Sequence, residues 1–145
     1  MERKTDKPHF HVTAGLIWHD GKLLIARRPP GTHLEGLWEF PGGKQEKGET
    51  LQECLERELR EELGMKVRAE NLVCTVEHEY ENRTISLHLF QCSYLSGQPM
   101  PLEGQETRWV HPKDLGEYNF PPPDYTFIRF LNKEPRPNLS KIHHQ

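Results

Sequence analysis

Residues 43 to 65 constrain the fold more than any other segment, because a glycine turn leads into a short glutamate-rich helix that ends at another glycine. Thr50 is a good N-cap, and Glu53 three residues later completes a capping box. Gly64 supplies the position at which a chain turns left-handed to leave a helix. The segment therefore predicts an α-helix from about Leu51 to Leu63.

The faces of this helix separate when each residue is turned by about 100°. One face is a leucine stripe at i, i+4 spacing, which should pack on a core: Leu51, Leu55, Leu59 and Leu63. The opposite face should be solvated and supported by i, i+4 ion pairs: Glu53, Glu56, Arg57 and Arg60. The remaining glutamates belong to neither face.

These three glutamates, Glu58, Glu61 and Glu62, meet along the edge of the leucine stripe. Carboxylates that converge beside apolar surface repel one another and are costly to desolvate. A merely acidic helix is the alternative interpretation, but an ordinary amphipathic helix would not place them there. A bound divalent cation is the simplest compensation, and such a cation commonly binds the phosphates of a substrate.

The same segment resembles the Nudix box at every fixed position. The pattern is Gly43-x5-Glu49-x7-Arg57-Glu58-Leu59-x-Glu61-Glu62-x-Gly64-Met65, and a motif of this length is far more specific than a lone glycine pattern. Roughly residues 9 to 132 are similar to the MutT-like branch of the Nudix hydrolases. The further segments that carry this similarity are Ala26-Arg27-Arg28, Gly36-Leu37-Trp38-Glu39-Phe40-Pro41-Gly42-Gly43-Lys44, Glu103-Gly104-Gln105-Glu106 and Phe120-Pro121-Pro122-Pro123-Asp124.

Strand-like segments and turns make up most of the remaining chain. Asp20-Gly21 is a tight-turn signal between two strands. We expect strands at His11–Trp18, Lys22–Arg28, Leu72–Tyr80, Thr84–Tyr94 and Thr107–Val110, and a C-terminal helix at about Asp124–Asn132. This order indicates an α/β or mixed α+β fold. The resemblance implies the Nudix α/β/α sandwich with a mixed central sheet.

Length and composition favour a small enzyme. The chain has 145 residues and a formal net charge of −3, so we predict a single domain over residues 1–145, with an ordered core of about 9–132 and mobile tails. The chain lacks a basic block, a transmembrane-length apolar run and a signal-peptide pattern. We therefore expect that it binds neither duplex nucleic acid nor membranes, and we predict a monomer or weak homodimer. Its three cysteines show no paired or zinc-type spacing, which indicates a cytoplasmic protein.

The resemblance also implies a metal site. Its ion would be Mg²⁺, with Mn²⁺ as the alternative, and its ligands would be the three edge glutamates and the backbone carbonyl of Gly42. Glu103 is a further candidate ligand or general base, and the alternative is a solvated loop glutamate. Arg57 belongs to the implied catalytic set through an ion pair with Glu49 that would hold the glycine loop against the helix. Gly43 and Gly64 complete the structural positions of the motif.

The substrate contacts that the resemblance implies lie far apart in the sequence. Arg28 and Lys44 are candidates for phosphate binding, although each has an alternative as an ordinary surface cation. Candidate residues of the base pocket are Phe40, Tyr80, Arg83 and Asp124. The best-known oxidised-dGTP enzymes have asparagine where this chain has Asp124, and an ionised aspartate only accepts hydrogen bonds. An aspartate after prolines is also a good N-cap, which is the structural alternative.

Three functions from different classes follow. The first is a MutT-like pyrophosphohydrolase that converts a nucleoside triphosphate to the monophosphate and pyrophosphate, acting on 8-oxo-dGTP in nucleotide-pool sanitising and DNA repair, or on CTP or modified dCTP. The second is a Nudix hydrolase of another nucleoside diphosphate compound, which the short chain and the Phe40, Asp124 pattern argue against. The third is a non-catalytic lesion-recognition module. Such modules typically lose the metal glutamates that this chain keeps.

Overall fold

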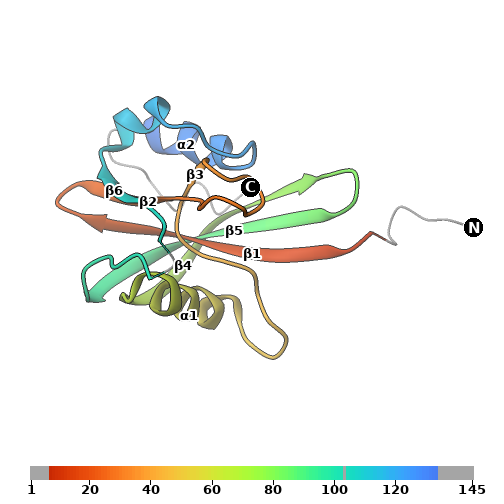
Figure 1. Cartoon of the computed structure of the whole chain (residues 1–145), viewed down its shortest axis with the longest axis horizontal. Coiled ribbons are helices and arrows are strands. Elements are labelled where there is room, and N and C mark those ends of the chain that lie inside the picture. Colours follow the sequence, from red (N-terminus) through yellow and green to blue (C-terminus); the bar gives the residue numbers. More distant parts are fainter. Residues whose placement is uncertain (1–6, 103, 134–145) are drawn as a thin grey trace, which may run out of the picture.

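A six-stranded mixed sheet forms the centre of the molecule (Figure 1). The computed structural model describes residues 7–102 and 104–133, so the expected mobile tails and Glu103 lie largely or wholly outside the described residues. The strands are β1 (His9–His19), β2 (Lys22–Arg27), β3 (Trp38–Glu39), β4 (Lys66–Glu79), β5 (Thr84–Ser96) and β6 (Thr107–Val110). Their order is β3-β2-β1-β5-β4, with β6 paired to β2. β1 and β5 run parallel, and the other pairs are antiparallel.

Helices cover both faces of this sheet, with α1 (Leu51–Leu63) on one side and α2 (Asp124–Lys133) on the other (Figure 1). A 3₁₀-helix, Pro112–Glu117, precedes α2. This arrangement confirms the predicted mixed α/β/α sandwich.

The bounds of α1 confirm the prediction, since the helix begins at Leu51 and ends at Leu63. The Thr50 hydroxyl accepts from the Glu53 N–H at 3.0 Å, and the Glu53 carboxylate accepts from the Thr50 N–H at 2.9 Å. Gly64 has a φ of 64°, the left-handed conformation expected of it. The predicted solvated face is wrong at Arg57, whose side chain is only 15 % exposed. The reason is that neighbouring carboxylates surround its guanidinium.

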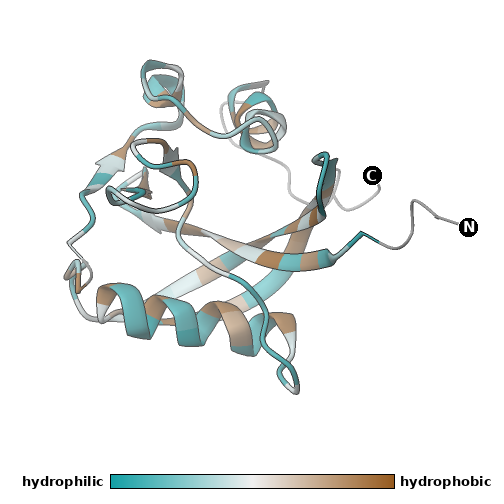
Figure 2. Cartoon of the chain, turned by 45° about the vertical axis from the view of Figure 1, so that its right-hand side comes forward, coloured by the Kyte–Doolittle hydropathy of each residue, from teal (hydrophilic) through white to brown (hydrophobic). Residues whose placement is uncertain are grey.

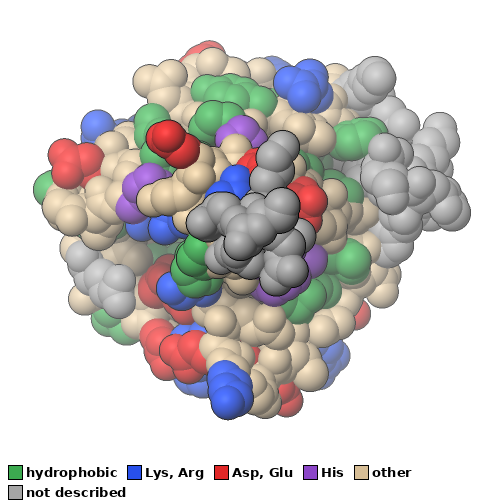
Figure 3. All heavy atoms as spheres, turned by 90° about the vertical axis from the view of Figure 1, so that its right-hand side faces the viewer, with side chains coloured by type: hydrophobic (Ala, Val, Ile, Leu, Met, Phe, Trp, Pro, Cys, Tyr) green, Lys and Arg blue, Asp and Glu red, His purple; other side chains and the backbone are tan. Residues whose placement is uncertain are grey.

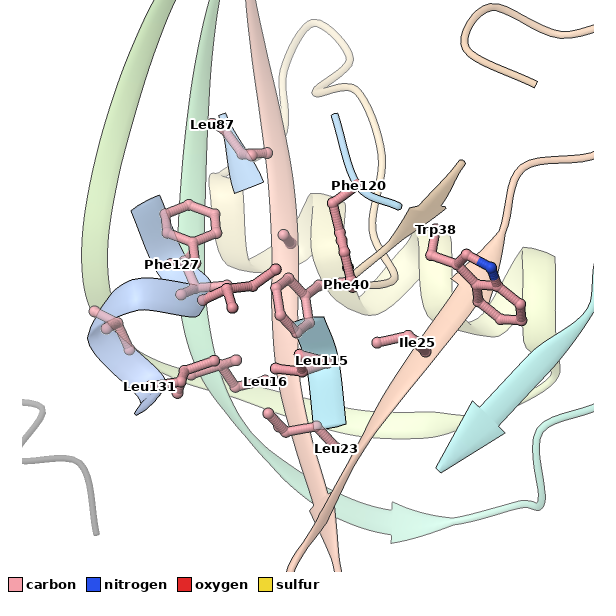
Figure 4. Close-up of a cluster of buried hydrophobic side chains, with 14 of the residues drawn as sticks. Leu16, Leu23, Ile25, Trp38, Phe40, Leu87, Leu115, Phe120, Phe127 and Leu131 are labelled. Atoms are coloured by element: carbon pink, nitrogen blue, oxygen red, sulfur yellow. The ribbon is translucent and has the colours of Figure 1, made fainter. Parts of the chain in front are cut away.

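Two apolar clusters lie on opposite faces of the sheet, because adjacent residues of a strand point to opposite sides. Figure 2 shows the hydrophobic stretches of the strands between the helical layers. The α1 side is formed by Ile17, Leu24, Leu55, Leu59, Leu63, Met65, Val67, Phe90 and Cys92. The α2 side includes Leu16, Leu23, Ile25, Phe40, Leu89, Leu115, Phe120, Phe127 and Leu131 (Figure 4).

The turn between β1 and β2 is the predicted tight turn, with φ values of 53° at Asp20 and 76° at Gly21. β4 begins at Lys66, earlier than the expected Leu72, and the register of its pairing with β5 shifts between Ala69 and Leu72. This irregularity interrupts the alternation of apolar and polar residues, which is the signal that reveals a strand. The sequence does not predict β3 or the 3₁₀-helix, because both are too short to show a periodic pattern of apolar residues.

Candidate active site

Residues 41–44, which precede α1 and which we call the glycine segment, lie antiparallel to β1. The Gly15 N–H donates to the carbonyl of Pro41 at 2.8 Å, and the Thr13 N–H donates to the carbonyl of Gly43 at 2.8 Å. A Cβ atom on Gly42 would lie 2.0 Å from the carbonyl oxygen of Thr13. Only glycine therefore allows the backbone to approach β1 so closely.

Gly43 brings the same segment against α1. A Cβ atom there would lie 2.3 Å from the carboxyl carbon of Glu58 and 2.6 Å from each of its oxygens. The glycine segment, β1 and the first glutamate of the predicted metal set consequently meet at one point.

Arg57 ties the glycine segment to the helix. Its Nη2 and Nε donate to the two carboxylate oxygens of Glu49 at 2.7 and 3.0 Å. Its Nη1 lies 3.2 Å from an oxygen of Glu58 and 3.2 Å from one of Glu61, and its Nη2 also donates to the Lys44 carbonyl at 3.3 Å. The hydrogen bonds from Arg57 and from the Glu46 backbone lower the pKa of Glu49 to about 2. The predicted Arg57–Glu49 pair is thus present.

A cleft of about 300 Å³ opens beside this junction. It brings together residues from β1, β3, the glycine segment, α1 and the start of α2. Eight of the site residues predicted from the sequence line this cleft: Arg28, Phe40, Gly42, Gly43, Lys44, Glu58, Glu62 and Asp124. We call this part of the site the glutamate lobe.

A second cavity of about 250 Å³ continues from the first, since Arg28, Glu39, Lys44 and Asp124 line both. Tyr80 and Arg83 line only this second part, with the Arg83 guanidinium 5.9 Å from the centre of the Tyr80 ring. Phe10 also lines it, and the Lys44 ammonium lies 4.4 Å from its ring centre. We call this part the aromatic lobe.

Glu61 does not line the cleft with its two partners; it is 57 % exposed and bonds Arg57. Within residues 7–102 and 104–133, no three His, Cys, Asp or Glu side chains are grouped as a metal site. The donor types nevertheless suit a hard divalent ion, because Glu58, Glu62 and the Gly42 backbone supply oxygens to one cleft. Arg57 supplies positive charge beside Glu58 and Glu61.

Arg28 reaches the cleft as predicted, but its guanidinium already has protein partners. Nη1 lies 3.2 and 3.3 Å from the oxygens of Glu39, and Nε donates to the carbonyl of His33 at 2.5 Å. Burial raises the pKa of Glu39, against the opposing influence of Arg28.

Glu39 is the residue that sequence reasoning missed. It lines both lobes, although no role was predicted for it. A signal was available, because a glutamate between Trp38 and Phe40 breaks an apolar run within a strand. A charged side chain in that position needs either a partner or a function.

Asp124 is buried, with 5 % of its surface exposed, at the first residue of α2. Burial, with the nearby charge of Glu39, raises the pKa of Asp124 well above its ordinary value, and a hydrogen bond with the Phe40 backbone opposes that rise. Asp124 lines both lobes of the cleft, and its surroundings stabilise the protonated carboxyl relative to that of an exposed aspartate.

Phe40 lines the glutamate lobe from within the core. It is only 2 % exposed, and its ring centre lies 5.5 Å from that of Phe120 and 6.4 Å from that of Phe127 (Figure 4).

The wider surface around the N-terminal end of β1 carries basic, acidic and histidine side chains interspersed with apolar ones (Figure 3). In the described part of the chain, no helix is long and apolar enough to cross a membrane.

Residues 13–129 match the NUDIX domain family. The chain is 38 % identical over 119 residues to the CTP pyrophosphohydrolase of Escherichia coli K12, covering 82 % of this chain and 88 % of that one. It is 35 % identical over 130 residues to the 8-oxo-dGTP diphosphatase of Haemophilus influenzae, covering 88 % and 96 %.

Solved structures agree with this likeness. The E. coli ORF135 protein superposes with a TM-score of 0.77 at 33 % identity, covering 92 % of this chain and 99 % of that one. The MutT protein of Methanosarcina mazei superposes with a TM-score of 0.79 at 26 % identity, covering 88 % and 96 %. The motif, the fold and these relatives together place the chain in the Nudix family of hydrolases.

Proposed function

We propose that this protein hydrolyses nucleoside triphosphates to the monophosphate and pyrophosphate, with Mg²⁺ as its ion and Mn²⁺ as an alternative. The observation that carries the proposal is the continuous two-lobed cleft, in which Glu58 and Glu62 line one end and Tyr80 and Arg83 the other. The relatives named for 8-oxo-dGTP and CTP hydrolysis support this substrate class.

The glutamate lobe would hold the ion through Glu58, Glu62 and the Gly42 carbonyl, with Glu61 and Glu103 as further ligands. A divalent ion bound there neutralises phosphate charge and activates water. Lys44 sits where the two lobes join and would hold the phosphate chain by charge. Arg57 would hold the glycine segment in place beside the glutamates through its bonds to Glu49, Glu58 and the Lys44 carbonyl.

The aromatic lobe would hold the base. A neutral Asp124 has both an O–H donor and a carbonyl acceptor, so it offers the pair of groups that asparagine offers. The keto form of 8-oxoguanine carries an N–H donor beside a carbonyl acceptor, and a neutral carboxyl matches both. The departure from asparagine at this position is therefore compatible with 8-oxo-dGTP.

CTP or a modified dCTP is the second candidate, and Glu39 is the observation that favours it. Its carboxyl lines both lobes, and when ionised it can accept from the exocyclic amine of cytosine. The match to the CTP pyrophosphohydrolase points the same way.

Pyrophosphate release from 8-oxo-dGTP, dGTP, CTP and dCTP, with each metal, tests the proposal. We expect Glu58→Gln and Glu62→Gln to lose nearly all turnover while melting as the wild type does. Glu53→Gln is the matched control, because that side chain only caps α1. Turnover near the wild-type rate in Glu58→Gln would contradict the assignment of the metal end.

Variants at the base end decide between the candidate substrates. If a neutral Asp124 reads the base, Asp124→Asn should keep activity on 8-oxo-dGTP and Asp124→Leu should lose it, whereas Glu39→Gln should depress CTP hydrolysis selectively. An unchanged order of substrates in Asp124→Leu and in Glu39→Gln would remove these residues from base reading. Cytoplasmic location and a monomeric or weakly dimeric state stay predictions.

A further inference from the structure

Thr13 is a buried hydroxyl at the point where β1 meets the glycine segment. Its residue is 1 % exposed, and it lines the glutamate lobe with Gly42, Gly43 and Glu58. A buried hydroxyl is normally hydrogen-bonded. The partners of this one belong to the glycine segment and to α1, and nothing in the Nudix motif accounts for it.

Thr13 contacts both polar groups of Gly43. Its N–H and its Oγ1 donate to the Gly43 carbonyl at 2.8 and 3.1 Å, and the Gly43 N–H faces the same Oγ1 at 3.4 Å. The Cys54 thiol completes the group, with Sγ 3.5 Å from the Gly43 carbonyl and 3.5 Å from the Thr13 Oγ1. The Gly43 carbonyl is thus fully engaged inside the protein.

These contacts fix the direction of the preceding carbonyl. The described part of the chain has no cis peptide bonds, and in a trans peptide the C=O and N–H groups point in opposite directions. The Gly43 N–H belongs to the same peptide unit as the Gly42 C=O. Because that N–H faces the Thr13 hydroxyl, the Gly42 carbonyl must point away from β1.

The neighbouring hydrogen bonds agree. The carbonyls of Pro41 and Gly43 both accept from β1, and alternate carbonyls of an extended segment point to opposite sides. Within residues 7–102 and 104–133, the Gly42 oxygen accepts no hydrogen bond. Gly42 itself lines the cleft that Glu58 and Glu62 also line.

We propose that Thr13 is a positioning residue, whose hydroxyl holds the Gly42–Gly43 peptide so that the Gly42 carbonyl faces the glutamate lobe as an oxygen ligand. Cys54 assists by engaging the Gly43 carbonyl. The inference rests on the proposed metal site. It adds a determinant of ion affinity that contributes no ligand atom of its own.

The test compares Thr13→Val, which keeps the side-chain shape and removes the hydroxyl, with Thr13→Ser, which keeps the hydroxyl. Mn²⁺ binding is titrated without nucleotide by the electron paramagnetic resonance signal of the free ion, so activity is not the readout. We expect Thr13→Val to weaken Mn²⁺ binding about 10-fold, as partners behind a ligand do when lost, and Thr13→Ser to restore it. The half-saturating Mg²⁺ concentration in turnover should move in parallel.

Thr75→Val is the matched control, because it removes an exposed strand hydroxyl that bonds His88 away from the cleft. It should bind Mn²⁺ as the wild type does. Equal affinity in folded Thr13→Val and wild type would overturn the inference and leave the metal site standing. A wild type that binds no Mn²⁺ would overturn the metal site itself. Should Thr13→Val fail to fold, Thr13→Ala against Thr13→Ser gives the same two outcomes.

Discussion

The guanidinium of Arg57 donates hydrogen bonds to both carboxylate oxygens of Glu49, at 2.7 Å from Nη2 and 3.0 Å from Nε. The pair joins the loop before α1 to the body of the helix. Paired, parallel N–H···O bonds of this kind are among the stronger polar contacts in proteins. The pair is therefore expected to influence both stability and its pH dependence.

Glu49→Gln should lower the melting temperature at neutral pH and flatten its dependence on acid. The folded pKa of about 2 lies below the ordinary value of 4.5. The contribution is therefore present above about pH 4.5 and is lost as the pH falls toward about 2. Melting curves from pH 7 to pH 2 check this, with Glu46→Gln as control. A Glu49→Gln curve parallel to the wild type would contradict it.

Gly43→Ala should damage catalysis more than folding. The added Cβ would meet the Glu58 carboxyl carbon at 2.3 Å, so the carboxylate must move. A displacement of about 1 Å at a reacting centre costs roughly 100-fold in rate. Turnover and melting temperature should be measured together. Gly116→Ala serves as control, since a Cβ there meets nothing within 4 Å. Normal turnover in Gly43→Ala would show that Glu58 tolerates the shift.

Asp124→Asn should raise stability at neutral and alkaline pH. A carboxyl whose pKa is raised by burial binds its proton more tightly in the folded protein. Stability of the wild type then falls as the pH rises above the ordinary value of 3.8 and through the folded pKa. Asparagine cannot titrate and removes that decline. Chemical denaturation at a series of pH values tests the sign. A variant that is less stable than the wild type at pH 8 would refute it.

Gly64→Ala should cost about 1 kcal/mol, because alanine resists the left-handed conformation. The φ of Gly64 is 64°, and an added Cβ would meet only the Met100 Cβ at 3.8 Å, an ordinary contact. The loss therefore reports backbone strain alone. Urea denaturation measures it. Turnover per folded molecule should be unchanged, since the residue only ends α1, and a large loss of turnover would show coupling to the glutamates.

The sequence predicts the parts of this protein whose signals are local. The capping box and Gly64 define α1 to the residue, and Asp20-Gly21 marks the first hairpin. The start of β4 is not predicted, because its irregular register with β5 interrupts the alternation of apolar and polar residues. Helical periodicity alone puts Arg57 on the solvated face, because it takes no account of the loop carboxylate of Glu49. The resemblance to the Nudix box predicts that pair, and the structure contains it.

The site shows the same division. The motif points to Glu58 and Glu62 because their spacing is fixed by one helix, and the structure places both beside one cleft. Glu39 was missed because its meaning depends on Arg28 and Asp124, which approach it only through the sheet and the start of α2. Contacts between segments that lie far apart in the chain produce no regular spacing of residues, so the sequence pattern does not predict them.

The two-lobed cleft has a consequence for how such an enzyme can change. The glycines and glutamates of the glutamate lobe come from one stretch of chain, Gly42 to Glu62. The residues that line only the aromatic lobe come from β1, the β2–β3 loop, the β4–β5 turn, β5 and the approach to α2. Substitutions at the aromatic end can accumulate one at a time without disturbing the residues that break the phosphate bond. Such a layout allows one hydrolytic apparatus to be redirected among nucleotides by altering its periphery alone.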